Sequence, residues 1–415
     1  MASAAPAAPR PQPVGIFGLP LGYLLLPAGG EDVDEVRTEM LQGRLPRQWP
    51  QPLAAHRLAA AGDRDGALAE LTGDDPATRY NRFVLDPDGL TDADTDTLRA
   101  DLGALGVLVD LVRFALGRAD AAPAADGLDG ELAAAAYSAQ ASAALADGNP
   151  VHAVELLDRA VAAAEPVSAP LAGLMHAAAG AICRDTGLPG AAERLQKALT
   201  ALDDADGLRV ARAETHLCLA GVLHEQAADA PHQLPAAVPH YHSTLQLIKR
   251  EDAPLVWAAA HAGLATAYLT MPMTEASGQL RLGVAAQSLR AALTVYTREE
   301  HPREWASVQL NLANSLVYTP SRHQRENLVE AAEIYESLLA VRTRETDPLG
   351  RARVLTNQGN VLAHLGIYDD AKAKLHEARA LFEELGDHDG VRTVRGVLDE
   401  IARQTVLSAN EGDAS

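Results

Sequence analysis

Aromatic residues and cysteines are scarce in this chain of 415 residues. Aromatics make up 4% of the sequence although hydrophobic residues reach 47%, so the apolar content is largely alanine and leucine. That composition favours helices over sheets. The only cysteines are Cys183 and Cys218. Two thiols in so long a chain do not make a disulfide framework. We therefore expect the protein to be located in the cytoplasm, which is a reducing environment.

Motifs that carry catalysis are missing as well. The sequence contains no G-x-S-x-G, no G-x-x-x-x-G-K-[ST], no H-E-x-x-H, no C-x-x-C and no G-x-G-x-x-G. These patterns place nucleophiles, phosphate-binding loops, metal ligands and dinucleotide-binding turns. We therefore predict that the chain is not an enzyme and that it needs no cofactor.

The charge balance argues against two classes of partner. The formal net charge is −21, and such a field repels nucleic acid and anionic lipid. The apolar segment 14–26 is broken by Pro20 and is too short to span a bilayer. A secretory signal would need a stronger basic start than the single Arg10. We predict neither a nucleic-acid nor a membrane partner.

The N-terminal third predicts single helices rather than repeated ones. Residues 1–12 are rich in alanine and proline and are expected to be disordered, as is the tail 406–415. We interpret segment 14–26 as a buried extended arm that closes the first helices; docking on a partner or in the protein's own groove are the alternatives. A helix is predicted from Thr91, with a buried apolar body over Leu98–Leu116.

Repetition dominates from about residue 129 onward. Three blocks that start at Ala237, Ala285 and Ala331 align without gaps, 48 and 46 residues apart. A second helical pattern alternates with them, and its small residue recurs as Ala220, Ala265, Ala313 and Gly359. Each unit therefore predicts two antiparallel helices that approach closely at the small residue. A single pair cannot bury its apolar face, so the pairs must stack.

These units resemble the tetratricopeptide repeat family, in a variant with extended loops. The last unit carries the motif residues Gly359, Gly366, Tyr368, Ala371 and Ala378. Two earlier units carry Gly148, Ala153, Ala160 and Pro166, and Gly180, Gly187, Ala192 and Ala198. About six helix pairs fit between residues 129 and 384, with a capping helix near 390–403. The added length of the central units falls in predicted loops at 270–283 and 318–327.

The resemblance implies an all-α fold, a right-handed α-solenoid of tetratricopeptide-like helix pairs preceded by an N-terminal helical domain. We predict the boundaries 13–125 for that domain and 126–405 for the superhelix with its capping helix. The family uses the concave groove to bind protein or peptide partners. The function predicted is thus a scaffold or adaptor; the alternative is a regulatory protein that senses a peptide. The oligomeric state is left open.

Polar residues of the first helices are the candidate partner-binding site. Asn311 and Asn314 recur one unit later as Asn357 and Asn360, at a spacing that places each pair on one helix face. In the family, matching amides bind the backbone of an extended peptide; hydrogen bonding between neighbouring repeats is the alternative. Arg353 lies one turn before Asn357 and could pair with a carboxylate of the partner. His261 occupies a groove-lining place in an earlier unit.

Histidines are concentrated between residues 216 and 242. That stretch holds five of the chain's 14 histidines and one cysteine, and imidazole and thiolate are ligands for zinc or copper. The weak metal candidates are His216, Cys218, His224, His240 and His242. A metal-handling or enzyme-maturation protein is therefore a further alternative, while ordinary polar positions explain the same residues without a metal.

Overall fold

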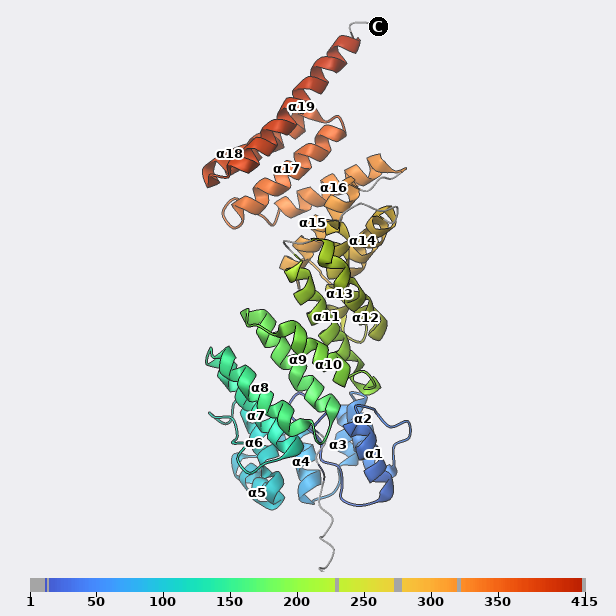
Figure 1. Ribbon diagram of the computed structural model, residues 1–415, viewed down its shortest axis with the longest axis vertical. Coiled ribbons are helices and arrows are strands. Elements are labelled where there is room, and N and C mark those ends of the chain that lie inside the picture. Colours follow the sequence, from blue (N-terminus) through green and yellow to red (C-terminus); the bar gives the residue numbers. More distant parts are fainter. Residues whose placement is uncertain (1–11, 13–14, 228–230, 272–277, 319–321, 413–415) are drawn as a thin grey trace, which may run out of the picture. The chain divides into compact units, whose positions relative to one another are not determined.

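The computed structural model describes residues 12, 15–227, 231–271, 278–318 and 322–412. Throughout this part of the chain the regular elements are helices, apart from two isolated bridges within residues 12–26, which confirms the all-α prediction. The chain forms two compact units, residues 1–222 and 223–415, which we call unit 1 and unit 2 (Figure 1). This division differs from the predicted boundary at 125/126, which separates single helices from repeated ones. No described helix combines the length and apolarity needed to cross a bilayer.

Unit 1 begins with single helices, and side-chain caps set the starts of three of them, α3, α4 and α5. Their bounds are α1 Glu31–Leu41, α2 Ala54–Ala60, α3 Arg64–Glu70, α4 Pro76–Leu85, α5 Asp92–Leu102 and α6 Val107–Ala115. The Thr91 hydroxyl accepts the Asp94 N–H, and the Asp94 carboxylate accepts the Thr91 N–H. This reciprocal cap stabilises the first turn of α5 and confirms the predicted helix start.

The prediction of one helix body over Leu98–Leu116 is wrong. A 3₁₀ turn over Gly103–Gly106 separates α5 from α6. Gly103 has φ of 57°, a left-handed conformation that glycine adopts without steric cost. At Gly106 a Cβ would lie 2.6 Å from the carbonyl oxygen of Arg99. The two glycines therefore end one helix and start another, although the apolar pattern runs through both.

The N-terminal segment packs against the helices of unit 1. Its buried residues are Gly15, Ile16, Leu24, Leu25 and Leu26. Backbone bridges join Gln12 to Leu26 and Leu19 to Gly22, so the segment folds back on itself instead of remaining extended. We call residues 12 and 15–26 the arm. Leu25 packs with Tyr80 of α4, while Leu26 packs in a second apolar cluster with Met40 of α1. The arm therefore closes the first helices, as predicted.

Paired helices complete unit 1. Their bounds are α7 Gly130–Ala146, α8 Pro150–Ala164, α9 Ala169–Thr186, α10 Ala191–Ala201 and α11 Arg209–Gln226, the last of which crosses into unit 2. In the α9/α10 pair a Cβ at Gly180 would lie 2.7 Å from Cγ of Leu195. Ala191 is buried at this contact, whereas the predicted Ala192 is only half-buried. The prediction for α10 was therefore wrong by one residue at Ala192, because adjacent alanines cannot be told apart by composition, whereas the predicted Ala198 is fully buried.

Unit 2 consists of successive helices that each pack on the next (Figure 1). Their bounds are α12 Val238–Leu247, α13 Pro254–Thr270, α14 Gly278–Ala292, α15 Pro302–Tyr318, α16 Gln324–Leu339, α17 Pro348–His364, α18 Tyr368–Leu385 and α19 His388–Gly412. The first helices of neighbouring pairs, α13, α15, α17 and α19, also contact one another. The predicted small residues Ala265 and Ala313 are fully buried, and Leu375 packs over Gly359. This arrangement is the stacked helix-pair architecture that the tetratricopeptide resemblance implies.

The ends and connections of unit 2 differ in detail from the prediction. Helix α19 buries Val391, Val394 and Ile401 against the preceding pair and so caps the core, as expected. It continues to Gly412, well past residue 403, because neither proline nor glycine occurs between residues 403 and 412. Helices α14 and α16 begin inside the predicted loops, and residues 272–277 and 319–321 of those loops lie outside the described residues.

Candidate functional site

Side-chain amides connect the first helices of unit 2. Nδ2 of Asn311 on α15 donates to Oγ1 of Thr266 on α13 at 3.3 Å. Nδ2 of Asn357 on α17 donates to Oδ1 of Asn314 on α15 at 3.1 Å. All four side chains are half-buried. We call Thr266, Asn311, Asn314 and Asn357 the amide row; it runs across three neighbouring helices.

Asn314 has a second internal contact. The hydroxyl of Tyr335 on α16 donates to Oδ1 of Asn314 at 2.6 Å, so both lone pairs of that oxygen are engaged. Burial raises the pKa of Tyr335, which keeps its hydroxyl protonated and able to donate. Asn314 thus ties α15 to its own second helix and to the next first helix. Hydrogen bonding between neighbouring repeats, one of the two roles considered for these asparagines, is therefore present in the structure.

Two of the predicted residues on α17 remain available to a partner. Arg353 is exposed and Asn360 is half-buried, and neither side chain is engaged by any described residue. Arg353 lies four residues before Asn357, and Asn360 lies three residues after it. Residues at these spacings share one face of a helix, so all three side chains lie on the same face of α17. The amide row therefore continues along α17 with a guanidinium at one end and an unengaged amide at the other.

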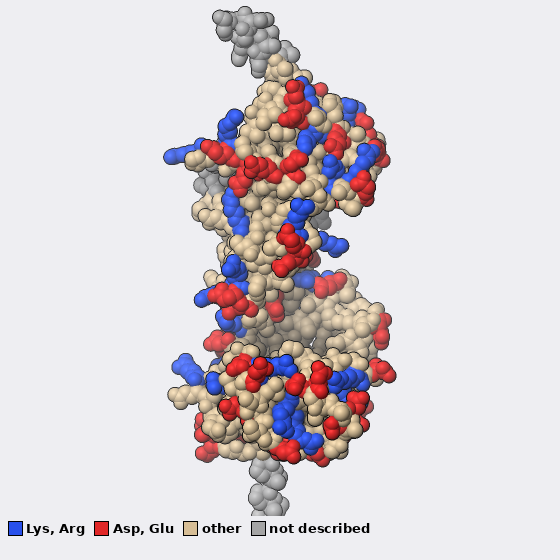
Figure 2. Space-filling model, turned by 180° about the vertical axis from the view of Figure 1, so that it is seen from behind, with Lys and Arg blue, Asp and Glu red and all other residues tan. Residues whose placement is uncertain are grey.

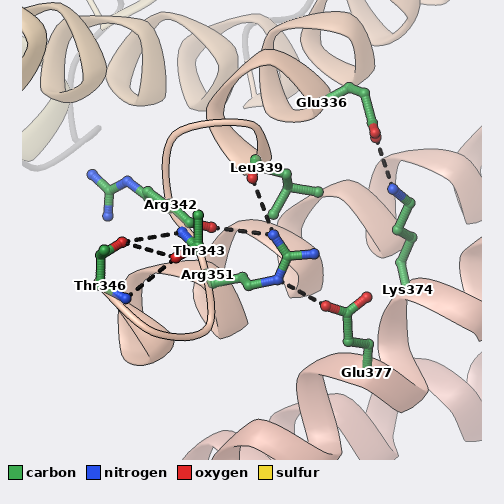
Figure 3. A network of polar contacts seen from close by, with 8 residues as sticks. All are labelled: Glu336, Leu339, Arg342, Thr343, Thr346, Arg351, Lys374 and Glu377. Carbon is green, nitrogen blue, oxygen red and sulfur yellow. Dashed lines mark hydrogen bonds and ion pairs between the residues drawn. The ribbon is translucent and has the colours of Figure 1, made fainter.

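A nearby arginine has a different role. Nη1 of Arg351 donates to the carbonyl oxygens of Leu339 and Arg342 at 3.0 and 3.1 Å, at the C-terminal end of α16 (Figure 3). Its Nε pairs with Glu377 of α18 at 2.8 Å. A cation that binds the last carbonyls of a helix stabilises that end. Arg351 therefore fixes α17 between α16 and α18, whereas no described residue engages the other arginine of this helix, Arg353.

The three first helices that carry the amide row have few acidic residues. Across α13, α15 and α17 the single carboxylate is Glu304. The second helices α16 and α18 carry four and five carboxylates, respectively. On the face drawn in Figure 2, acidic and basic side chains are interspersed rather than separated. In a chain with net charge −21, the helices that carry the amide row thus hold few of the carboxylates.

His261, the remaining predicted binding residue, packs edge-on against Trp257, with ring centroids 4.3 Å apart. Partial burial lowers the pKa of His261, so the ring is neutral at physiological pH. The side chain lies on α13 among apolar neighbours. It offers a neutral aromatic surface rather than a charge to a partner.

The structure gives the metal candidates other contacts. Nδ1 of His224 lies 3.2 Å from the Tyr241 hydroxyl, and Nε2 of His242 lies 2.9 Å from the Tyr268 hydroxyl. His216, Cys218 and His240 also have partners. Among the described residues no three His, Cys, Asp or Glu side chains are grouped so that they could hold an ion.

Comparison with known proteins gives distant structural similarities. No family model and no curated protein matches the sequence. A Rap protein solved in complex with competence and sporulation factor is 16% identical over 84% of this chain and 96% of its own, with a TM-score of 0.41. The TPR domain of P58(IPK) is 14% identical over 86% of this chain and 98% of its own, with a TM-score of 0.28. Both TM-scores are low, so the fold assignment rests on the helix pairing of this chain itself.

Proposed function

We propose that the protein is a non-catalytic scaffold that binds a protein or peptide on the first helices of unit 2. The observation that carries this proposal is the amide row, with Arg353 and Asn360 beside it on α17. Polar side chains are aligned there across three adjacent helices. The surrounding helix faces supply few carboxylates, so the surface combines neutral hydrogen-bonding groups with one exposed cation.

The amides retain capacity for a partner after their internal bonds are made. A primary amide can make four hydrogen bonds, two as donor and two as acceptor. Asn311 uses one donor position in its bond to α13, and Asn357 is engaged with both Asn314 and the Tyr335 hydroxyl. The oxygens of these two amides have no partner among the described residues. Such oxygens can accept the backbone N–H of an extended peptide, whatever its side chains are. The amide N–H groups of Asn360 can donate to a peptide carbonyl.

The internal bonds also make the surface better suited to binding. Because Asn357 is held by Asn314, and Asn314 by Tyr335, the amides lose little further freedom when a partner arrives. Groups already held in place bind more tightly than equivalent mobile groups, since less side-chain entropy is lost. The amide row can thus connect neighbouring repeats and bind a partner at the same time.

The test compares two double variants in capture of partners from the native host. Arg353→Ala/Asn360→Ala removes two polar side chains of α17 that no described residue engages. Arg325→Ala/Asn327→Ala removes the same two side-chain types from α16 and is the matched control. We expect partners retained by the wild type and the control to be lost with the α17 variant, by about tenfold or more in apparent affinity. Equal recovery with both variants would show that binding does not use this surface.

A further inference from the structure

Unit 1 contains a cavity that the proposed scaffold role does not use. It has a volume of about 580 Å³ and lies between the arm, α2, α4 and the turn that joins α5 to α6. Its apolar walls include Leu25, Pro52, Leu71, Leu102, Ala104 and Leu105. Cavities of this size and character are the usual sites of small-molecule binding in proteins.

A histidine with an unpaired nitrogen lines this cavity. His56 on α2 is 6% exposed, and its Nε2 lies 2.9 Å from the carbonyl oxygen of Leu25. A carbonyl only accepts, so Nε2 carries the proton and Nδ1 of the neutral ring is an acceptor. Burial lowers the pKa of His56, in agreement with a neutral ring. Among the described residues that line the cavity, His56 alone has a buried side-chain nitrogen or oxygen without a partner.

The second buried polar residue of the cavity is fully occupied with the arm. Oδ1 of Asn81 accepts the Leu25 N–H at 2.7 Å, and its Nδ2 donates to the Leu25 carbonyl at 2.8 Å. Both backbone groups of Leu25 are thereby fixed, and Leu25 forms one wall. The His56 ring is therefore held through Nε2 beside a wall of defined position. Its Nδ1 is closed to solvent, so a ligand reaches this nitrogen when the ring shifts slightly towards the cavity. A buried acceptor without a donor costs free energy that a bound N–H or O–H would recover.

The charged residues of the cavity restrict what can enter. Partial burial tends to raise the pKa of Asp75, but hydrogen bonds from Thr78 and Ala77 outweigh it and lower that pKa below its usual value. Asp75 is therefore ionised, and the carboxylate of Asp101 pairs with Arg79 at 2.9 Å. Two carboxylates on the lining disfavour an anionic molecule.

We propose that this cavity binds a small, uncharged and largely apolar molecule that donates one hydrogen bond to Nδ1 of His56. Such a molecule would also contact Leu25, Pro27 and Ala28, which belong to the arm and the segment after it. Binding therefore stabilises the arm in its buried position. The site is separate from the surface on α13, α15 and α17, so either can function without the other.

The first experiment titrates the full-length protein with N-phenyl-1-naphthylamine, an uncharged aromatic amine with one N–H and a fluorescence that increases in apolar surroundings. We expect saturable binding of one molecule per chain. Ala28→Trp places a large side chain at the exposed rim of the cavity and should weaken binding about tenfold or more. Ala121→Trp is the control, because Ala121 is also exposed but lines a different cavity of about 540 Å³.

A second measurement tests the hydrogen bond itself. In the ¹⁵N spectrum of histidine-labelled protein, the probe should shift the Nδ1 resonance of His56 and leave its Nε2 resonance nearly unchanged. The anionic probe 8-anilinonaphthalene-1-sulfonate should bind more weakly than the uncharged one. Absence of saturable binding, equal binding to both tryptophan variants, or an unchanged Nδ1 resonance at saturation would each overturn the proposal.

Discussion

The α9/α10 pair of unit 1 and the α17/α18 pair of unit 2 are built on the same contact. In unit 1, a Cβ at Gly180 would lie 2.7 Å from Cγ of Leu195 and 3.3 Å from the carbonyl oxygen of Ala191. In unit 2, a Cβ at Gly359 would lie 2.6 Å from Cγ of Leu375 and 3.2 Å from the carbonyl oxygen of Ala371. Two segments about 180 residues apart in the chain thus use one packing solution.

The two units differ in what their long-range polar bonds connect. In unit 1, Asn81 and His56 hold the arm, an element that occurs once. In unit 2, Asn311 and Asn357 join one repeat to the next. The helix pair therefore supplies a common framework, and polar side chains give each unit a separate role. We assign small-molecule binding to the first and partner binding to the second.

The shared glycine contact gives the largest expected effect. Gly180→Ala and Gly359→Ala should each lower the free energy of unfolding of their own unit by about 2 kcal/mol, because the added methyl overlaps a leucine and a carbonyl. Denaturant titrations of both variants measure the two losses. Gly396→Ala on α19 is the control, since no atom lies within 4 Å of the added Cβ. That variant should gain up to about 1 kcal/mol in helix propensity. Losses confined to one of the two pairs would contradict the shared packing.

Removal of the amide that holds the arm should affect unit 1 alone. Asn81→Ala leaves the N–H and carbonyl groups of Leu25 with fewer partners in a buried place, at a cost of about 2 kcal/mol. Hydrogen exchange of the Leu25 amide should accelerate, while the amides of α17 stay protected. Asn327→Ala on α16 provides a surface control. Unchanged exchange at Leu25 would show that the arm is held by its apolar side chains and not by Asn81.

A corresponding change in the amide row should affect unit 2 alone. Tyr335→Phe removes one donor from Asn314 and should cost about 1 kcal/mol. Asn357→Ala removes the other donor, and the double variant should cost less or more than the sum, because both bonds meet at one oxygen. Denaturant titration of the three variants gives the coupling. Strict additivity would mean that the two bonds act independently.

The smallest expected effect is a pH dependence of unit 1. Burial holds the pKa of His56 below its usual value of 6.5, so the unfolded chain takes up this proton first as the pH falls. Stability should therefore decrease as the pH falls from about 6.5 towards the lowered pKa of the folded state. His56→Gln, whose amide can still donate to Leu25, should flatten this slope when unfolding midpoints are measured across that range. An unaltered slope would assign the dependence to other histidines.

Much of unit 2 could be predicted from the sequence because its helix pairs depend on near neighbours. The recurrence of Ala265, Ala313 and Gly359 predicts where helices meet, and all three lie at buried contacts. The candidate site was predicted in part. The alignment of the amides follows from their spacing in the sequence. That Asn314 bonds Tyr335 and Asn357, while no described residue engages Arg353 or Asn360, depends on side-chain geometry.

By itself, the sequence determined the all-α class, the pairing of helices and the cap at Thr91, because periodicity and capping involve residues a few positions apart. Only the tertiary structure decided how the arm is bound. Asn81 meets Leu25 across 56 positions of the chain, and Glu131 accepts the Gly15 N–H across 116. No local pattern records such contacts, since they form only when separate helices have packed. The cavity beside His56 has the same origin, for a cavity is a property of the packed elements together.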